Sequence, residues 1–158
     1  LGVRSVTLYW SIGAISEIPI IFYSGKLIRR FGIGPLLMAS GIIMALRLLL
    51  YALAPTVPLV IVIQLLHAVT FGLMLSTGFN YVNQTAPRHR RGTAMGVFNA
   101  LGIGLAVFLG SAIGGFLVEA VGYTGMFAIL AVAPATSAVM ILLLMRRKGE
   151  LVAASAEG

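Results

Sequence analysis

Five long apolar runs, separated by short polar loops, determine what this sequence can fold into. The runs cover approximately residues 5–24, 33–53, 57–82, 92–118 and 122–146. As a helix, each is about long enough to cross the ~30 Å hydrocarbon core of a bilayer. The chain is 59% hydrophobic and 9% charged, against about 45–50% and about 25% in soluble domains. Because lipid permits only helices or closed barrels, and the runs are longer than barrel strands, we predict an all-α polytopic membrane helical bundle of five spans.

Basic residues lie almost entirely in alternate loops. The first loop, the third loop and the segment directly after the last run together hold nine of the eleven Lys and Arg residues, and the second and fourth loops hold none. Short loops rich in Lys and Arg stay on the cytoplasmic side. We therefore predict a multi-pass protein of the cell (cytoplasmic or inner) membrane with a cytoplasmic C-terminus. Binding of the basic clusters to acidic lipid heads would give the same orientation. The nine residues are Lys26, Arg29, Arg30, Arg88, Arg90, Arg91, Arg146, Arg147 and Lys148.

Three ionisable residues stand alone inside apolar runs: Glu17, Arg47 and His67. At 1.5 Å per residue, Glu17 lies about 12 Å and Arg47 about 20 Å from the predicted cytoplasmic edge, and His67 lies about 15 Å from the opposite edge, so all three are close to the bilayer midplane. An ionisable group at this depth is costly without a partner and marks a candidate functional site. Because the three residues come from different helices and share one depth, we expect one bundle to gather them.

Each of these residues also has a purely structural interpretation. Glu17 and Arg47 could form an ion pair that only fastens two helices together, and His67 could be a packing histidine. However, Gln64, His67 and Thr70 are spaced three residues apart and form one polar stripe on a helix, which favours a cavity-lining face. The charge of a carboxyl at Glu17 would depend on its surroundings. A substrate or helix that changed them would convert binding into proton uptake or release.

Glycine and proline indicate how the helices pack. Gly92 with Gly96, and Gly110 with Gly114, form two GxxxG spacings, which let helix backbones approach closely. Pro19 in the first run and Pro134 in the last allow local kinks.

The sequence contains no pattern typical of an enzyme, a cofactor site or a metal site. There is no cysteine, and the two histidines, His67 and His89, lie on different elements without a carboxylate ligand at metal-binding spacing. The Gly-rich stretch lies inside an apolar run rather than in a phosphate-binding loop. The positive charges gather at helix ends, so we expect no nucleic-acid partner. We predict no catalytic residues, no cofactor and no metal.

Several segments resemble the C-terminal half of major facilitator superfamily transporters, in the group that contains the phenylpropionate and lactose permeases. The resemblance covers almost the whole chain. It rests on residues 16–32, 41–50, 62–72 and 90–117, and on a basic loop motif like that of the family. The motif residues are Gly25, Lys26, Arg29, Arg30 and Gly32.

The resemblance implies a domain organisation. Residues 1–148 would be part of a six-helix half, corresponding to helices 8 to 12 of a twelve-helix carrier, and residues 149–158 a disordered cytoplasmic tail. Helix 7 and the N-terminal half of the same polypeptide would lie outside this chain. Substrate binds near the midplane between the two halves of such carriers.

The resemblance also assigns roles to individual residues. Arg47 and His67 match a proton-coupling arginine and histidine of the family, so Arg47 would act on a carboxyl and His67 would hydrogen-bond in the site. The sequence has Gln64 where a lysine is expected and Thr70 where an acid is expected. Glu17 would therefore carry the coupling proton, and Gln64, His67 and Thr70 would contact substrate.

Together these features predict a secondary active transporter that takes up a small organic solute with protons by alternating access. The solute would be an aromatic acid, a sugar or a nucleoside, and the partners would be this solute, the proton, the bilayer and the missing half. The alternatives are a proton-antiport efflux pump and a membrane subunit that does not transport. A membrane-embedded enzyme is disfavoured because its catalytic groups would converge near one surface, whereas these three lie at mid-depth.

Overall fold

The structure, a computed structural model, describes residues 3–53 and 56–156, with side chains described for most residues between 11 and 147. This part of the chain is helical and contains no strand, which confirms the predicted all-α membrane bundle. The elements are α1 (Val3–Phe31), α2 (Ile33–Leu53), α3 (Val57–His67), the π-helical turn η1 (Ala68–Gly72), α4 (Leu73–Thr85), the 3₁₀ turn η2 (Arg88–Arg90), α5 (Arg91–Val97), the π-helical segment η3 (Phe98–Leu105), α6 (Ala106–Leu130) and α7 (Val132–Ala156).

Several of these elements follow one another without a break and form longer helices. The third predicted run corresponds to α3, η1 and α4 in succession, and the fourth to α5, η3 and the first part of α6. Glycines with positive φ separate two pairs of runs: Gly32 (φ 79°) lies between α1 and α2, and Gly122 (φ 72°) kinks α6. Glycine accepts this left-handed backbone without the steric penalty that other residues meet.

Within the described residues, three helical stretches are long and apolar enough to cross a membrane: Ile33–Leu53, Pro58–Thr85 and the 60-residue stretch Arg88–Arg147. At 1.5 Å per residue the last would be about 90 Å long if straight, so the kink at Gly122 divides it into the fourth and fifth predicted spans. The first predicted span, 5–24, lies within α1, which is not one of the three. Helix α7 continues to Ala156 and so covers most of the segment expected to be a disordered tail.

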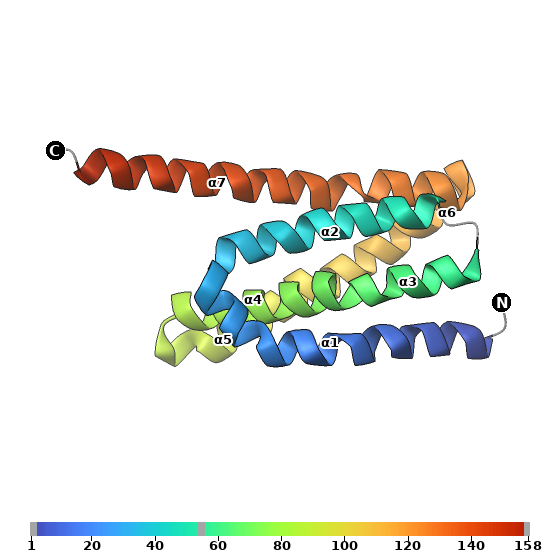
Figure 1. Ribbon diagram of the computed structural model, residues 1–158, viewed down its shortest axis with the longest axis horizontal. Helices are drawn as coiled ribbons and strands as arrows, with labels where there is room; N and C mark the ends of the chain where they lie inside the picture. Colours follow the sequence, from blue (N-terminus) through green and yellow to red (C-terminus); the bar gives the residue numbers. More distant parts are fainter. Residues whose placement is uncertain (1–2, 54–55, 157–158) are drawn as a thin grey trace.

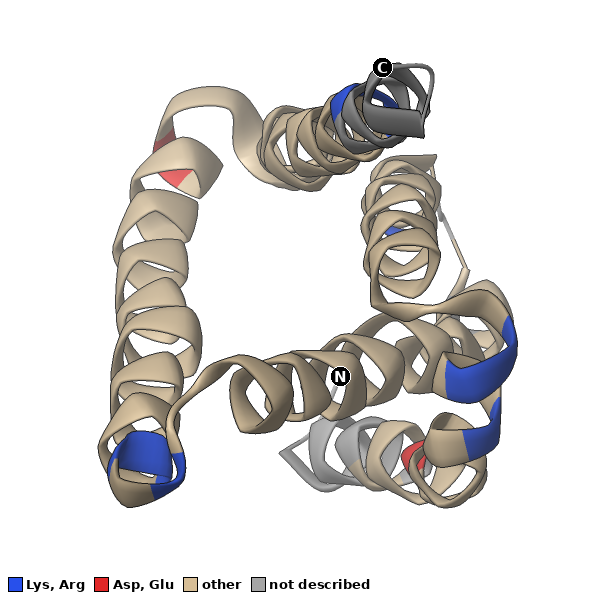
Figure 2. Ribbon diagram, turned by 90° about the vertical axis from the view of Figure 1, so that its left-hand side faces the viewer, with Lys and Arg blue, Asp and Glu red and all other residues tan. Residues whose placement is uncertain are grey.

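These long helices lie side by side and form an elongated bundle (Figure 1). Helix α2 packs against α7, α6 and α4, and α1 packs against α3, η1 and α4. The connection from α1 to α2, the connection from α4 to α5 and the end of α7 all lie at one end of the bundle (Figure 1). The described Lys and Arg residues of the three basic clusters therefore gather at this end, which Figure 2 views along the helices.

Apolar side chains cover the outside of the bundle, and small or polar residues fill much of the inside. Phe22 is 79% exposed and Phe108 68% exposed, whereas Ala68, Ala138 and Thr77 are buried. This arrangement is expected for helices in lipid, where apolar surface needs no protection from water and small residues let the helices approach closely.

The closest backbone approach involving a glycine lies between α2 and α7. A Cβ atom at Gly41 would stand 3.1 Å from the carbonyl oxygen of Pro134 and 3.3 Å from the Ala138 Cβ. The glycines of the two GxxxG spacings are less closely packed than Gly41. A Cβ atom added at Gly92, Gly96 or Gly110 would have no neighbouring described atom within 4 Å. Close packing at those glycines stays a prediction.

We expect Gly41→Val to destabilise the protein by about 1–3 kcal/mol, because overpacking forces neighbouring backbone to shift and the nearest atom here belongs to the backbone of α7. Leu46→Phe is the control, since it enlarges a side chain on the same helix that is 50% exposed. The measurement is the thermal unfolding midpoint of the purified protein in detergent. Equal midpoints for the two variants would contradict the proposed packing.

Candidate functional site

The three isolated ionisable residues meet inside the bundle in a line of contacts. Glu17 lies on α1, Arg47 on α2 and His67 at the end of α3. The His67 Nε2 atom is 2.9 Å from the Glu17 Oε1 atom, and Arg47 Nη1 is 2.7 Å from His67 Nδ1. Because a guanidinium group only donates, Nδ1 is the acceptor, and a neutral imidazole carries its proton on Nε2, facing Glu17. The described side chains therefore place His67 between Glu17 and Arg47, in contrast to the direct ion pair weighed from the sequence.

Arg47 is the centre of a wider hydrogen-bond network. Its Nη2 donates to the Gln64 Oε1 atom at 2.6 Å and to the Tyr51 hydroxyl at 3.2 Å, and its Nη1 also donates to the Thr70 hydroxyl at 3.4 Å. Tyr51 itself donates to Gln64 at 2.5 Å. All three residues of the predicted polar stripe thus face Arg47.

Two aromatic residues adjoin this site, and Tyr51 was not expected there from the sequence. Tyr51 stands one turn after Arg47, at the i,i+4 spacing at which helical side chains meet, so this spacing was the available signal. The ring of Phe71 stacks on the His67 ring, with centroids 5.3 Å apart and planes 7° apart. Both aromatic residues restrict the positions that the polar side chains can adopt.

The site is largely withdrawn from the surface. Arg47 is 7% exposed, and its Nε atom is buried without a hydrogen-bond partner among the described residues. The Glu17 side chain is 14% exposed and that of His67 is 29% exposed. Removing a charge from water is costly unless partners compensate for it, and here four side chains accept hydrogen bonds from the one permanent cation, Arg47. His67 is the most accessible of the three ionisable groups.

Local backbone features bring α1 and α3 close enough for this contact. A Cβ atom at Gly13 would lie 3.3 Å from the His67 Cδ2 atom, and one at Gly72 would lie 3.5 Å from the Glu17 Cβ. The chain also switches from α-helix to the wider π-helical turn η1 directly after His67. Such turns are rare and occur frequently at functional sites.

The other predicted site residues lie elsewhere. Gly25, Lys26, Arg29, Arg30 and Gly32 belong to the end of α1 and the turn after it, where Lys26 lies over the Tyr23 ring and Arg30 over the Phe31 ring, each 5.3 Å from the centroid. The four GxxxG glycines lie on α5 and α6. Neither group joins the cluster of Glu17, Arg47 and His67.

Comparison with known proteins agrees with this architecture. Residues 4–144 match the model of the MFS_1 like family. Maltose permease from Geobacillus stearothermophilus is 28% identical over 143 residues, which are 90% of this chain and 36% of that protein. The probable 3-phenylpropionic acid transporter of Escherichia coli (strain K12) is 28% identical over 131 residues, 80% of this chain and 33% of the relative. No solved structure matches.

A further relative is the putative nucleoside transporter of Escherichia coli (strain K12), 29% identical over 124 residues, which cover 75% of this chain and 29% of that protein. The chain spans about a third of the length of these curated relatives. The family match extends over nearly the whole chain and includes every residue of the cluster described above. The chain therefore belongs to the MFS_1 like family, within the major facilitator superfamily of membrane transporters.

Proposed function

We propose that this chain is part of a secondary active transporter that takes up a small organic solute together with protons. The observation that carries the proposal is the line of contacts from Glu17 through His67 to Arg47. It joins a carboxyl, an imidazole and a permanent cation, contributed by three different helices. A carboxyl and an imidazole in contact can exchange a proton, and a movement of any of the three helices would change that contact.

In this proposal Glu17 carries the coupling proton, and Arg47 influences it through His67. The 2.9 Å contact gives Glu17 a nearby group with which to share a proton. The 2.7 Å contact holds His67 in the orientation that presents Nε2 to Glu17. A structural pair that only fastened helices would need neither a titratable bridge nor the partial exposure of His67.

The solute is proposed to bind beside the same cluster, with Gln64, His67 and Thr70 offering polar contacts. The relatives are named for maltose, 3-phenylpropionic acid and a nucleoside, and we propose a solute of the sugar, aromatic acid or nucleoside class. Each of these carries groups able to exchange hydrogen bonds with amide, imidazole and hydroxyl side chains.

The chain is proposed to supply helices 8 to 12 of a twelve-helix carrier, with its basic end in the cytoplasm of a cell whose inner membrane it spans. Facilitator halves rock against one another around a site near the midplane. A longer polypeptide would provide the opposite wall of the site. The gathering of three basic clusters at one end supports this orientation through the preference of Lys and Arg for the cytoplasmic side.

We expect Glu17→Gln to reduce accumulation against a gradient to background while exchange of solute across the membrane continues, since exchange does not require release of the proton. Proteoliposomes containing the complete carrier are given a pH gradient and labelled maltose, 3-phenylpropionate or uridine, and the solute that the wild type accumulates is then used. Glu119→Gln, on α6, is the control because it removes a carboxyl outside the site. Accumulation by the Glu17→Gln protein at the wild-type rate would refute the assignment.

Solute affinity tests the polar stripe separately. Gln64→Ala and His67→Ala should each weaken binding about threefold to tenfold, the usual effect of losing one hydrogen bond. Leu65→Ala serves as the matched control, since Leu65 is on the same helix and 53% exposed. Affinity is measured as the half-saturating solute concentration in exchange. If both alanine variants bind the solute as the wild type does, these side chains are not substrate contacts.

A further inference from the structure

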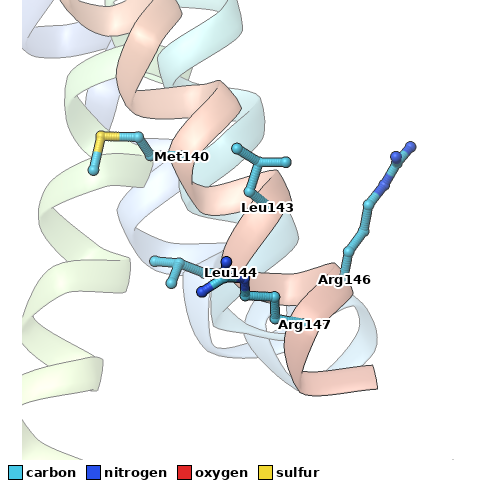
Figure 3. Close-up of a pocket in the computed structure, with 5 residues that line it drawn as sticks. All are labelled: Met140, Leu143, Leu144, Arg146 and Arg147. Carbon is cyan, nitrogen blue, oxygen red and sulfur yellow. The ribbon is translucent and has the colours of Figure 1, made fainter. Parts of the chain in front are cut away.

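A second feature of the structure lies on α7, away from the cluster of Glu17, Arg47 and His67. An open pocket of about 530 Å³ is lined by Met140, Leu143, Leu144, Arg146 and Arg147 (Figure 3). It has the volume of many small-ligand sites. Its lining residues fall within eight positions of one helix, with apolar side chains first and arginines at the end nearest the C-terminus.

The apolar and the basic lining residues of this pocket succeed one another along the helix axis. Met140, Leu144 and Arg147 are spaced at i, i+4 and i+7, and so lie along one face. At 1.5 Å per residue, Met140 and Arg147 are about 10 Å apart along the axis, which is the length of several methylene groups. Figure 3 shows that Arg146 leaves the helix in a different direction from Arg147. The apolar wall is therefore bordered by guanidinium groups on more than one side.

The apolar wall is open to the surroundings. Met140 is 63% exposed, Leu143 53% and Leu144 64%. In a membrane such a surface faces acyl chains. Arginine binds phosphate oxygens with paired hydrogen bonds, and basic pockets at the cytoplasmic end of membrane helices bind anionic headgroups.

The surrounding charge also favours an anion. The described basic residues at the end of α1 and around η2 lie at this same end of the bundle (Figure 2). The two described carboxyl side chains lie on other elements: Glu17 is on α1, inside the bundle, and Glu119 is on α6, whose connection to α7 lies at the end opposite the C-terminus (Figure 1). Arg146, Arg147 and Lys148 also outnumber Glu150, the acid that follows them in the sequence, so a negative headgroup at the end of α7 would meet an excess of positive charge.

We propose that this pocket binds an anionic phospholipid, with the phosphate on Arg147, Arg146 adding positive charge beside it, and an acyl chain along Met140, Leu143 and Leu144. The two halves of the ligand match the two halves of the pocket, and the positive end of the bundle concentrates such lipids around it. The proposal does not depend on which solute the carrier transports or on proton coupling.

The test uses the complete protein in vesicles with a phosphatidylglycerol whose acyl chain carries a photoactivatable diazirine. We expect the label to map to residues 140–144, and a phosphatidylcholine with the same chain to label them much less. Arg146→Gln/Arg147→Gln should reduce labelling about tenfold or more, because each basic residue near an anionic lipid surface contributes roughly fivefold. Arg88→Gln/Arg90→Gln is the matched control, since it removes the same charge at the same end but outside the pocket.

Three results would overturn the proposal. Equal loss in both double variants would mean that only the total charge of this end attracts lipid. Competition by inorganic phosphate as effective as that by unlabelled phosphatidylglycerol would indicate a simple anion site. Labelling of correctly folded protein outside residues 140–144 would also exclude the proposed lipid site. This result is expected if another segment of the carrier fills the pocket. Leu144→Gln changes the apolar wall and leaves Arg146 and Arg147 in place, and it should also lower labelling. If this variant keeps the wild-type thermal unfolding midpoint, the lower labelling reflects loss of the lipid site and not loss of the fold.

Discussion

The cost of holding a permanent positive charge inside a membrane bundle governs this structure. Arg47 is almost fully buried, and an arginine at that depth is destabilising unless other groups compensate for it. Four side chains accept its hydrogen bonds: Tyr51, Gln64, His67 and Thr70. Glu17 joins this network one step away, through its contact with His67. These contacts join α1, α2 and α3 around the arginine.

The surrounding fold is built to allow that convergence. Gly13 and Gly72 have no side chains, which lets the helices approach closely where Glu17 and His67 meet. The π-helical turn η1 changes the helix geometry directly after His67. On the other side of α2, Gly41 allows α7 to approach. Large apolar side chains are left on the outside, where lipid solvates them at no cost. The protein therefore places its polar groups inside and its bulky apolar groups outside.

Much of this was predictable because it depends on local sequence. Run length predicts helices, alternate basic loops place three clusters at one end, and three-residue spacing places Gln64, His67 and Thr70 on one face. The order of contacts was not predictable, because a direct Glu17–Arg47 pair and a bridging histidine require the same residues at the same depths. Tyr51 was missed for a related reason: a tyrosine near a span end is equally typical of the membrane interface.

The sequence by itself determined that this chain is a helical membrane bundle with three ionisable groups at one depth, because hydrophobic length and rise per residue are properties of each helix alone. Only the tertiary structure decided that His67 stands between Glu17 and Arg47, and that the three stripe residues all turn toward the arginine. Those facts depend on the rotation of each helix about its axis and on distances of a few ångströms between helices, which are set by packing at positions such as Gly13, Gly72 and Gly41.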